Sequence, residues 1–174
     1  MSQVGYRIRQ FWQDLTAPRL TAVAQTDVAA RLTPAELSLF QRFSRSDQWH
    51  SYRVMKTLQA SGQMQPELLT AALLHDVGKT RVNLSIWERS WIVLAETVWP
   101  QKTAVWGQGE PLGWQRPFVV KAQHPAWGAE MAAGAGSSPL AVELICRHQD
   151  NGLETAVTEA DKLLHWLQWA DDQN

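Results

Sequence analysis

Four histidines and a small set of aspartates are the residues of this chain whose types could together bind a metal ion. Neutral imidazole nitrogens and carboxylate oxygens suit Mn, Fe or Zn and, with more oxygen ligands, Mg. The candidates are His50, His75, Asp76, His124, His148 and one late aspartate, Asp171 or Asp161. The fifth histidine, His165, is expected to be structural. Because Cys146 is the single cysteine, an intramolecular disulfide and a thiolate metal cage are both excluded.

Helical spacing directs several of these side chains toward the core. His50 shares a helix face with residues four, seven and eight positions later, and His148 shares one with residues three, four and seven positions earlier. His75 and Asp76 follow the most apolar run of the chain, where a carboxylate is costly to bury unless it is paired or bound to metal. One such histidine is more often a hydrogen-bonded core residue. Three of them with a buried aspartate are hard to satisfy by hydrogen bonds alone.

The elements that must position these residues are predicted to be helices separated by short Pro, Gly and Ser breaks. Helices are expected over 6–15, from 34, from 46 or 47 to 61, and over 67–77, 84–98, 124–133, 139–148 and 159–171. Gly78 is expected to end the fourth of these as a C-terminal cap residue. Since no segment alternates with period two, an all-α fold is predicted.

The composition is that of one globular domain. The chain has 174 residues, of which 45% are hydrophobic and 19% charged, enough to bury a sizeable core. A net charge of −1 gives no electrostatic support for binding duplex nucleic acid. The N-terminus lacks the pattern of a signal peptide, and no segment has the length and apolarity of a transmembrane helix. With a single cysteine, these features lead us to expect a cytoplasmic protein.

The order of the candidate ligands resembles the H…HD…H…H…D pattern of the HD-domain metal-dependent phosphohydrolases. It reads His50 in WHSYRV, His75-Asp76 in AALLHDVGK, His124 in HPAWGAE, His148 in ICRHQD and Asp171 in LQWADD. The stretch ALLHDVGK is the most specific part of the match, which covers about residues 46 to 172. The resemblance implies an HD-like helical bundle over 46–174, with an N-terminal helical extension over 1–45.

The last ligand is a choice between two aspartates. Asp161 lies three residues after Thr158 in the first turn of the predicted final helix, where an acid stabilises the helix terminus. Asp171 lies four residues after Leu167 and seven after Leu164, so it extends an apolar face. We therefore favour Asp171 and keep Asp161 as the alternative.

The resemblance also implies how the metal would be held. One divalent ion would have the ligands His50, His75, Asp76 and Asp171, and a second would be bound by His124, His148 and a bridging Asp76. With one or two ions, a metal-bound hydroxide would hydrolyse a small phosphate ester, such as a nucleotide or a dinucleoside polyphosphate. Asp76 and Lys79 are the predicted catalytic residues. Lys79 is expected to hold a phosphate oxygen, with Arg81 and Arg147 as weaker phosphate contacts.

Two alternatives to hydrolysis stay open. The same scaffold could be a regulatory module that binds metal without turnover, or a mixed-valence di-iron oxygenase. A cyclic-dinucleotide substrate is disfavoured, because the chain lacks a GYP signature and Arg147 stands where those enzymes have a second histidine.

Tryptophan is the compositional oddity, with ten in the chain and five between His75 and His124. Residues 100–117 are rich in Gly, Pro and Trp and are predicted to form a loop or lid. The tryptophans of segment 87–114 could cover the site and stack on a base, or could be core or dimer-interface residues. We favour the second interpretation, which allows for a homodimer.

Overall fold

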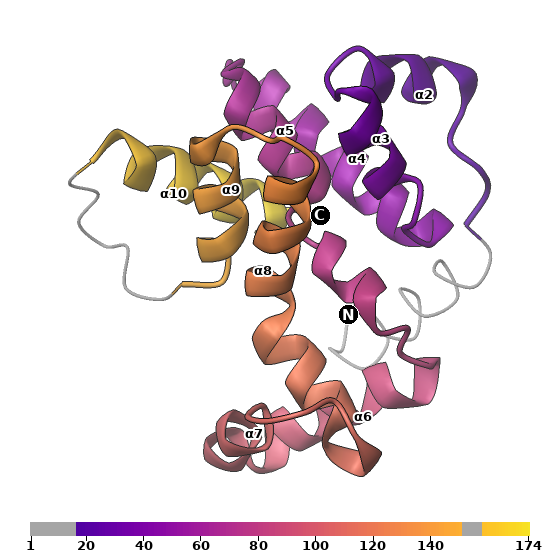
Figure 1. The fold of residues 1–174 in the computed structure, drawn as a ribbon, viewed down its shortest axis with the longest axis vertical. Helices are drawn as coiled ribbons and strands as arrows, with labels where there is room; N and C mark the ends of the chain where they lie inside the picture. Colours follow the sequence, from indigo (N-terminus) through magenta and orange to yellow (C-terminus); the bar gives the residue numbers. More distant parts are fainter. Residues whose placement is uncertain (1–16, 151–157) are drawn as a thin grey trace.

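Within residues 17–150 and 158–174, the part of the chain that the computed structural model describes, every regular element is a helix (Figure 1). The α-helices are α2 (Ala22–Ala29), α3 (Pro34–Phe40), α4 (Arg45–Ala60), α5 (Pro66–Leu74), α6 (Ile86–Val98), α7 (Pro100–Trp106), α8 (Arg116–Gly134), α9 (Pro139–Arg147) and α10 (Glu159–Asp172). Two 3-10 helices, η1 (Val77–Arg81) and η2 (Gly113–Gln115), lie between them. The predicted all-α fold is confirmed, and the helix expected over 6–15 falls outside the described residues.

Helix starts follow from local sequence chemistry. The Thr33 hydroxyl accepts from the backbone N–H of Glu36, and the Glu36 carboxylate accepts from the backbone N–H of Thr33. The same reciprocal capping box begins α6 at Ser85 and α10 at Thr158. Helix α4 begins slightly earlier than predicted, because Ser44 rather than Ser46 or Asp47 is its N-terminal cap.

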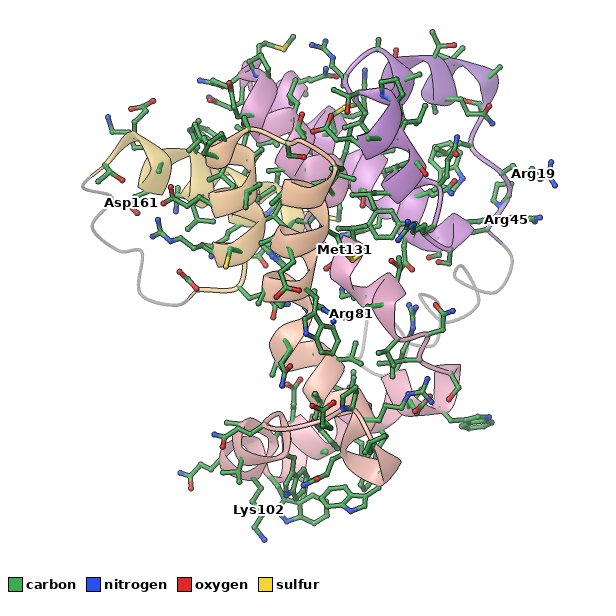
Figure 2. All side chains as sticks on the ribbon, in the orientation of Figure 1. Arg19, Arg45, Arg81, Lys102, Met131 and Asp161 are labelled. Atoms are coloured by element: carbon green, nitrogen blue, oxygen red, sulfur yellow. The ribbon has the colours of Figure 1, made fainter. Side chains whose placement is uncertain are left out.

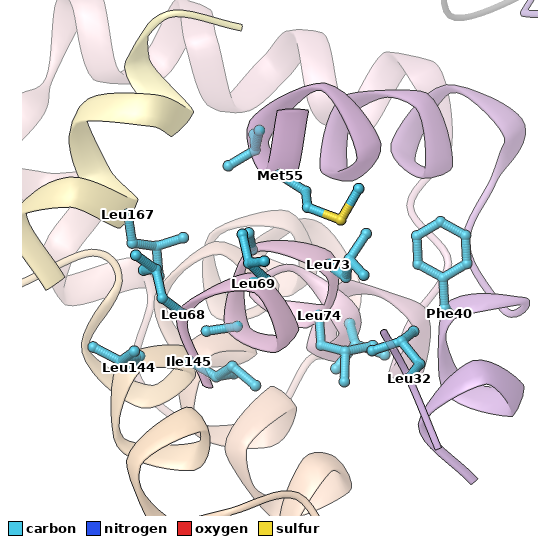
Figure 3. Packing of buried hydrophobic residues seen from close by; sticks show 14 of the residues in the cluster. Leu32, Phe40, Met55, Leu68, Leu69, Leu73, Leu74, Leu144, Ile145 and Leu167 are labelled. Atoms are coloured by element: carbon cyan, nitrogen blue, oxygen red, sulfur yellow. The ribbon is translucent and has the colours of Figure 1, made fainter. Parts of the chain in front are cut away.

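Helix α5 occupies the centre of the core. Every residue from Leu68 to Leu74 is buried, and α3, α4, α9 and α10 all pack against this helix. Figure 3 shows its leucines between Met55 of α4, Leu144 and Ile145 of α9, and Leu167 of α10. A helix that is apolar all round has to be covered on every side, which explains its central position.

The segment before α4 belongs to the same core. Leu20, Val28 and Phe40 are buried in the cluster that contains the α5 leucines. Glu36 is also buried, and its second carboxylate oxygen accepts a 2.6 Å hydrogen bond from the Ser137 hydroxyl, which joins α3 to the loop after α8. Residues 17–44 therefore pack as part of the bundle, and the division of the chain at residue 46 stays a prediction.

Two predictions about η1 and α8 are wrong: the role of Gly78 as a helix cap, and the start of a helix at His124. Helix α5 ends at Leu74 and the φ angle of Gly78 is not positive, so Gly78 is not its cap. Gly78 is needed for a different reason: a Cβ there would lie 2.0 Å from the carbonyl oxygen of His124 and 2.7 Å from the backbone nitrogen of Gly128. His124 does not begin a helix either, because α8 runs from Arg116 and contains both His124 and Pro125.

The predicted loop over 100–117 instead contains α7, η2 and the start of α8. Pro100 and Pro117 lie in the first turns of their helices, where a missing N–H costs no hydrogen bond. This segment and α6 form the end of the molecule far from α2 and α3, and α8 runs between the two ends (Figure 1). No described helix has the length and apolarity needed to span a bilayer.

Four of the five tryptophans of this end are exposed, namely Trp87, Trp91, Trp99 and Trp114. On α6, an outward stripe consists of Trp87, Trp91, Leu94 and Val98, and Trp87 is 79% exposed. Trp106 packs edge-on against both Trp99 and Trp114, with ring centroids 6.4 and 5.1 Å away. The interpretation as core is therefore wrong for the exposed tryptophans, and a role in a dimer interface stays a prediction.

The close contact between η1 and α8 leads to a stability prediction. Gly78→Ala should lower the free energy of unfolding by about 3 kcal/mol, the upper end of typical overpacking costs, because the new methyl group meets backbone rather than a movable side chain. Gly134→Ala is the matched control at the end of α8, where a Cβ would meet no atom within 4 Å. Urea unfolding of the metal-free proteins tests this. A Gly78→Ala protein as stable as the Gly134→Ala protein would contradict it.

Candidate metal centre

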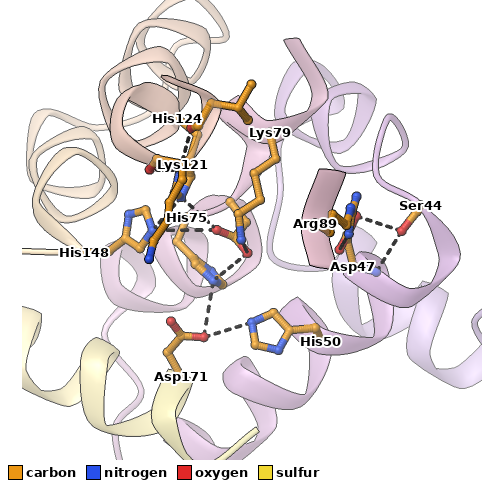
Figure 4. Close-up of polar contacts among 12 residues, drawn as sticks. Ser44, Asp47, His50, His75, Lys79, Arg89, Lys121, His124, His148 and Asp171 are labelled. Atoms are coloured by element: carbon orange, nitrogen blue, oxygen red, sulfur yellow. Dashed lines mark hydrogen bonds and ion pairs between the residues drawn. The ribbon is translucent and has the colours of Figure 1, made fainter. Parts of the chain in front are cut away.

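Six side chains from five helices or their ends meet where α5 passes into η1 (Figure 4). His50 lies on α4, His75 and Asp76 between α5 and η1, His124 on α8, His148 at the end of α9, and Asp171 on α10. They form a first group, His50, His75 and Asp171, and a second group, Asp76, His124 and His148. Within each group, one potential ligand atom per residue lies within 4.8 Å of the others. The structure thus brings all six predicted ligands together.

The first group is partly open to solvent. The Nε2 atom of His50 lies 2.9 Å from Oδ1 of Asp171, and the Nε2 atom of His75 lies 3.6 Å from the same oxygen. His75 is buried, whereas the side chain of Asp171 is 33% exposed. A small molecule could therefore approach this group from the side of α4 and α10.

The second group is buried. Oδ1 of Asp76 lies 3.2 Å from Nε2 of His124 and 3.7 Å from Nε2 of His148. The other carboxylate oxygen of Asp76 lies 3.5 Å from Nε2 of His75, in the first group. Because its two oxygens face different groups, Asp76 has the geometry of a bridging carboxylate.

Backbone carbonyls determine which nitrogen of each ring faces the centre. The Nδ1 atoms of His75, His124 and His148 lie 3.0, 2.8 and 2.8 Å from the carbonyl oxygens of Ala72, Lys121 and Ile145. A carbonyl can only accept, so Nδ1 carries the proton in each ring and Nε2 is left for the centre. Sequence reasoning missed these carbonyls, although each belongs to the residue three positions before its histidine.

Nitrogen lone pairs face one another in this arrangement. The Nε2 atoms of His124 and His148 are 3.2 Å apart, and two neutral rings with protonated Nδ1 offer only acceptors there. Nε2 of His75 is buried without a hydrogen-bond partner. Facing acceptors that are buried without a donor are costly, and a divalent cation would satisfy the Nε2 atoms of His124 and His148 and bind Nε2 of His75 in place of a proton. The donor set therefore fits a metal ion.

The charges around Asp76 alter several pKa values. Burial raises the pKa of Asp76, but Lys79 and His75 outweigh burial and hold it well below the usual range. Burial lowers the pKa of His75, but the carboxylates of Asp76 and Asp171 raise it to about 9. Burial lowers the pKa of His124, which keeps that ring neutral. In the metal-free protein His75 thus holds a second proton, which a cation would displace.

Lys79 is the one predicted phosphate contact that touches these groups. Its Nζ atom lies 2.6 Å from Oδ2 of Asp76, and its side chain is 36% exposed. Burial lowers the pKa of Lys79, but Asp76 outweighs burial and raises it, so the ammonium stays charged. Asp47 contributes to this rise, and it also receives hydrogen bonds from Ser44 and Arg89 beside the site (Figure 4). Nothing in the sequence spacing pointed to Asp47.

The structure does not bring the two predicted arginines to the six ligands. Arg81 pairs with Glu130 at 3.0 Å and lies over the ring of Trp127 on the surface of α8 (Figure 2). The guanidinium of Arg147 is shared among three carboxylates, those of Glu143, Asp150 and Asp161.

The alternative last ligand, Asp161, lies near the start of α10 (Figure 2), and it belongs to neither of the two groups. It accepts hydrogen bonds from Arg147 and from the hydroxyl and backbone N–H of Thr158. The bond from Arg147, followed by those from Thr158, lowers the pKa of Asp161 to about 2. Asp161 therefore acts as a helix-capping residue, and Asp171 is the aspartate that lies beside the histidines.

The raised pKa of His75 predicts how stability depends on pH in the metal-free protein. A group whose pKa rises from 6.5 to about 9 on folding stabilises the fold fully below pH 6.5, and this contribution is lost as the pH rises through 9. The loss should be on the order of 3 kcal/mol. The free energy of unfolding of chelator-treated wild type, measured with urea, should therefore fall between pH 6.5 and 9. It should fall less steeply for the His75→Gln protein. Equal slopes would refute the assignment to His75.

Comparison with known families gives a match to the HD domain over residues 49–172, a range that contains all six grouped ligands. Searches among curated proteins and among solved structures gave no significant match. The matched range covers well over half of the 174 residues, and the resemblance noted in the sequence is confirmed. The chain therefore belongs to the HD domain family.

Proposed function

We propose that this protein is a metal-dependent phosphohydrolase that acts on a small phosphate ester. The observation that carries the proposal is the pair of His/Asp groups with one buried carboxylate between them. Membership of the HD family supports it, because HD domains are generally metal-dependent hydrolases. A nucleotide or a dinucleoside polyphosphate is the substrate class that we propose.

The ligand assignment follows from the two groups. His50, His75 and Asp171, together with Asp76, would hold one divalent ion, and Asp76, His124 and His148 would hold a second. Divalent ions in such a site polarise a phosphate ester and make a water molecule nucleophilic near neutral pH. Burial of the second group and exposure of the first suggest that substrate enters beside Asp171.

Asp76 and Lys79 have distinct proposed roles. Asp76 stays ionised despite its burial and presents one oxygen to each group, so it orients the centre. Lys79 reaches solvent from the same place and keeps its charge. With Asp76 engaged as a metal ligand, the ammonium would be available to hold a phosphate oxygen and to offset negative charge that develops during hydrolysis. Arg81 and Arg147 remain weaker candidates, because carboxylates already hold both guanidinium groups.

Removal of a ligand from the junction of the two groups gives the main test. His75→Ala should lower phosphate release from a nucleotide panel by at least about 100-fold in Mn-loaded protein, because it removes a buried ligand rather than an outer-shell partner, whose loss costs roughly 10–100-fold. His165→Ala, an exposed histidine of α10, is the control and should retain activity. Wild-type protein that binds Mn but releases no phosphate would favour the regulatory module. Iron-loaded protein with an oxygen-dependent absorption change would favour the oxygenase.

The proposed role of Lys79 gives a separate prediction. Lys79→Met should lower kcat/KM by about 100-fold or more, the usual cost of losing one donor that stabilises charge in a transition state. Affinity for Mn should stay equal or rise, because the ammonium that pairs with Asp76 repels a cation. Isothermal titration and steady-state kinetics of the same preparations separate the two effects. A parallel loss of Mn affinity and activity would show that Lys79 supports the ligands rather than the substrate.

A further inference from the structure

Three histidines of the two groups share one backbone contact. The rings of His75, His124 and His148 each donate from Nδ1 to the carbonyl oxygen three residues earlier, over 3.0, 2.8 and 2.8 Å. This bond fixes the orientation of the ring and leaves Nε2 directed at the centre. The carbonyl must therefore be free to accept a side-chain donor.

For two of the histidines, the end of a helix frees the carbonyl. His75 is the C-cap residue of α5 and His148 is the C-cap residue of α9, so each follows the last residue of its helix. The last four carbonyls of an α-helix have no donor within the helix. Ala72 and Ile145 both lie in these final turns, and their carbonyls are open to the imidazoles.

His124 lies in the interior of α8, where helix geometry frees no carbonyl. In a continuous helix the carbonyl of Lys121 would accept from the backbone N–H of residue 125. Residue 125 is proline, which has no N–H, so this carbonyl lacks its helical donor. The Nδ1 atom of His124 lies 2.8 Å from it, closer than the 3.2 Å to the carbonyl of Val120 (Figure 4).

We propose that Pro125 is a positioning residue for the second metal group. By leaving the Lys121 carbonyl open, it holds His124 with Nδ1 protonated and Nε2 directed at Asp76 and His148. An interior proline disfavours a helix, and the need for this open carbonyl explains why one stands in α8. The inference rests on the proposed function, since it takes the second group to bind a divalent ion.

Pro125→Ala restores the missing N–H and tests the inference. The matched control is Pro117→Ala, which changes a second buried proline of α8 in the first turn, where no carbonyl is freed. Zinc titration by calorimetry should show about 10-fold weaker binding of one ion to Pro125→Ala, within the usual cost of disturbing an outer-shell partner. The thermal midpoint of the metal-free protein should stay equal or rise, because α8 regains a hydrogen bond. Pro117→Ala should match wild type in zinc affinity.

Two outcomes would overturn the role of Pro125. Unchanged zinc affinity in Pro125→Ala would do so, and so would a loss of affinity that is accompanied by a lower thermal midpoint, which indicates packing alone. If Pro125→Ala does not fold, the imidazole ¹⁵N spectrum of zinc-loaded wild type decides: His124 must bind through Nε2 with Nδ1 protonated, and coordination through Nδ1 refutes the inference. Wild-type protein that binds no zinc would refute the proposed metal function itself, and this inference with it.

Discussion

The arrangement of this fold depends on one buried charge, the carboxylate of Asp76. It follows directly on α5, the helix whose residues are buried on every side, so the chain carries an ionised group into its own core. Burial of an unpaired carboxylate is too costly to survive in a folded protein. Lys79 of η1 and His75 at the end of α5 supply positive charge to it. His124 of α8 and His148 of α9 bring ring nitrogens to 3.2 and 3.7 Å from its Oδ1, where a cation would join them to the carboxylate. The packing of these elements against one another therefore also determines how the charge of Asp76 is balanced.

The helix ends and the glycines serve this same requirement. Helix α5 stops at Leu74, so the chain turns into η1 and brings Lys79 back to Asp76. The turn fits because Gly78 and Gly128 let η1 and α8 approach backbone to backbone, which also brings His124 next to the carboxylate. Histidines at helix ends, or beside an interior proline, lie next to carbonyls that have no helical donor, and hydrogen bonds to these carbonyls orient the rings. In a regular helix these carbonyls would accept from backbone N–H groups instead.

Much of the fold could be predicted from sequence, because helix starts and helix faces depend on short-range patterns. The grouping of the ligands was predicted from the resemblance to the HD pattern, since it joins residues that are far apart in the chain. Helix starts such as Thr33 depend on residues three apart, and His50 and His148 follow helical spacing to an apolar face. The errors have physical reasons. Pro100 and Pro117 were predicted to lie in a loop and Pro125 at a helix start, but first-turn positions tolerate proline and Pro125 lies inside α8. Gly78 was predicted to be a helix cap because the contact that requires a glycine there, with the backbone of His124, joins residues that are distant in the chain. Glu130, which pairs with Arg81, is likewise distant in the chain, whereas Arg147 is held by Asp161 and by two carboxylates within four residues, those of Glu143 and Asp150.

The two ligand groups differ in how much of the chain must be in place before they exist. The second group lies between residues 76 and 148, whereas the first needs α10 to dock against α4, the two helices that carry Asp171 and His50. Asn174 adds to this docking with a 3.0 Å hydrogen bond to the hydroxyl of Thr57 on α4. Joining residues 50 and 171 closes a longer loop than joining residues 76 and 148, and so it costs somewhat more chain entropy. A cation bound in the first group would therefore stabilise the docking of α10 against α4. The metal affinity of this group would in turn depend on the free energy of that docking.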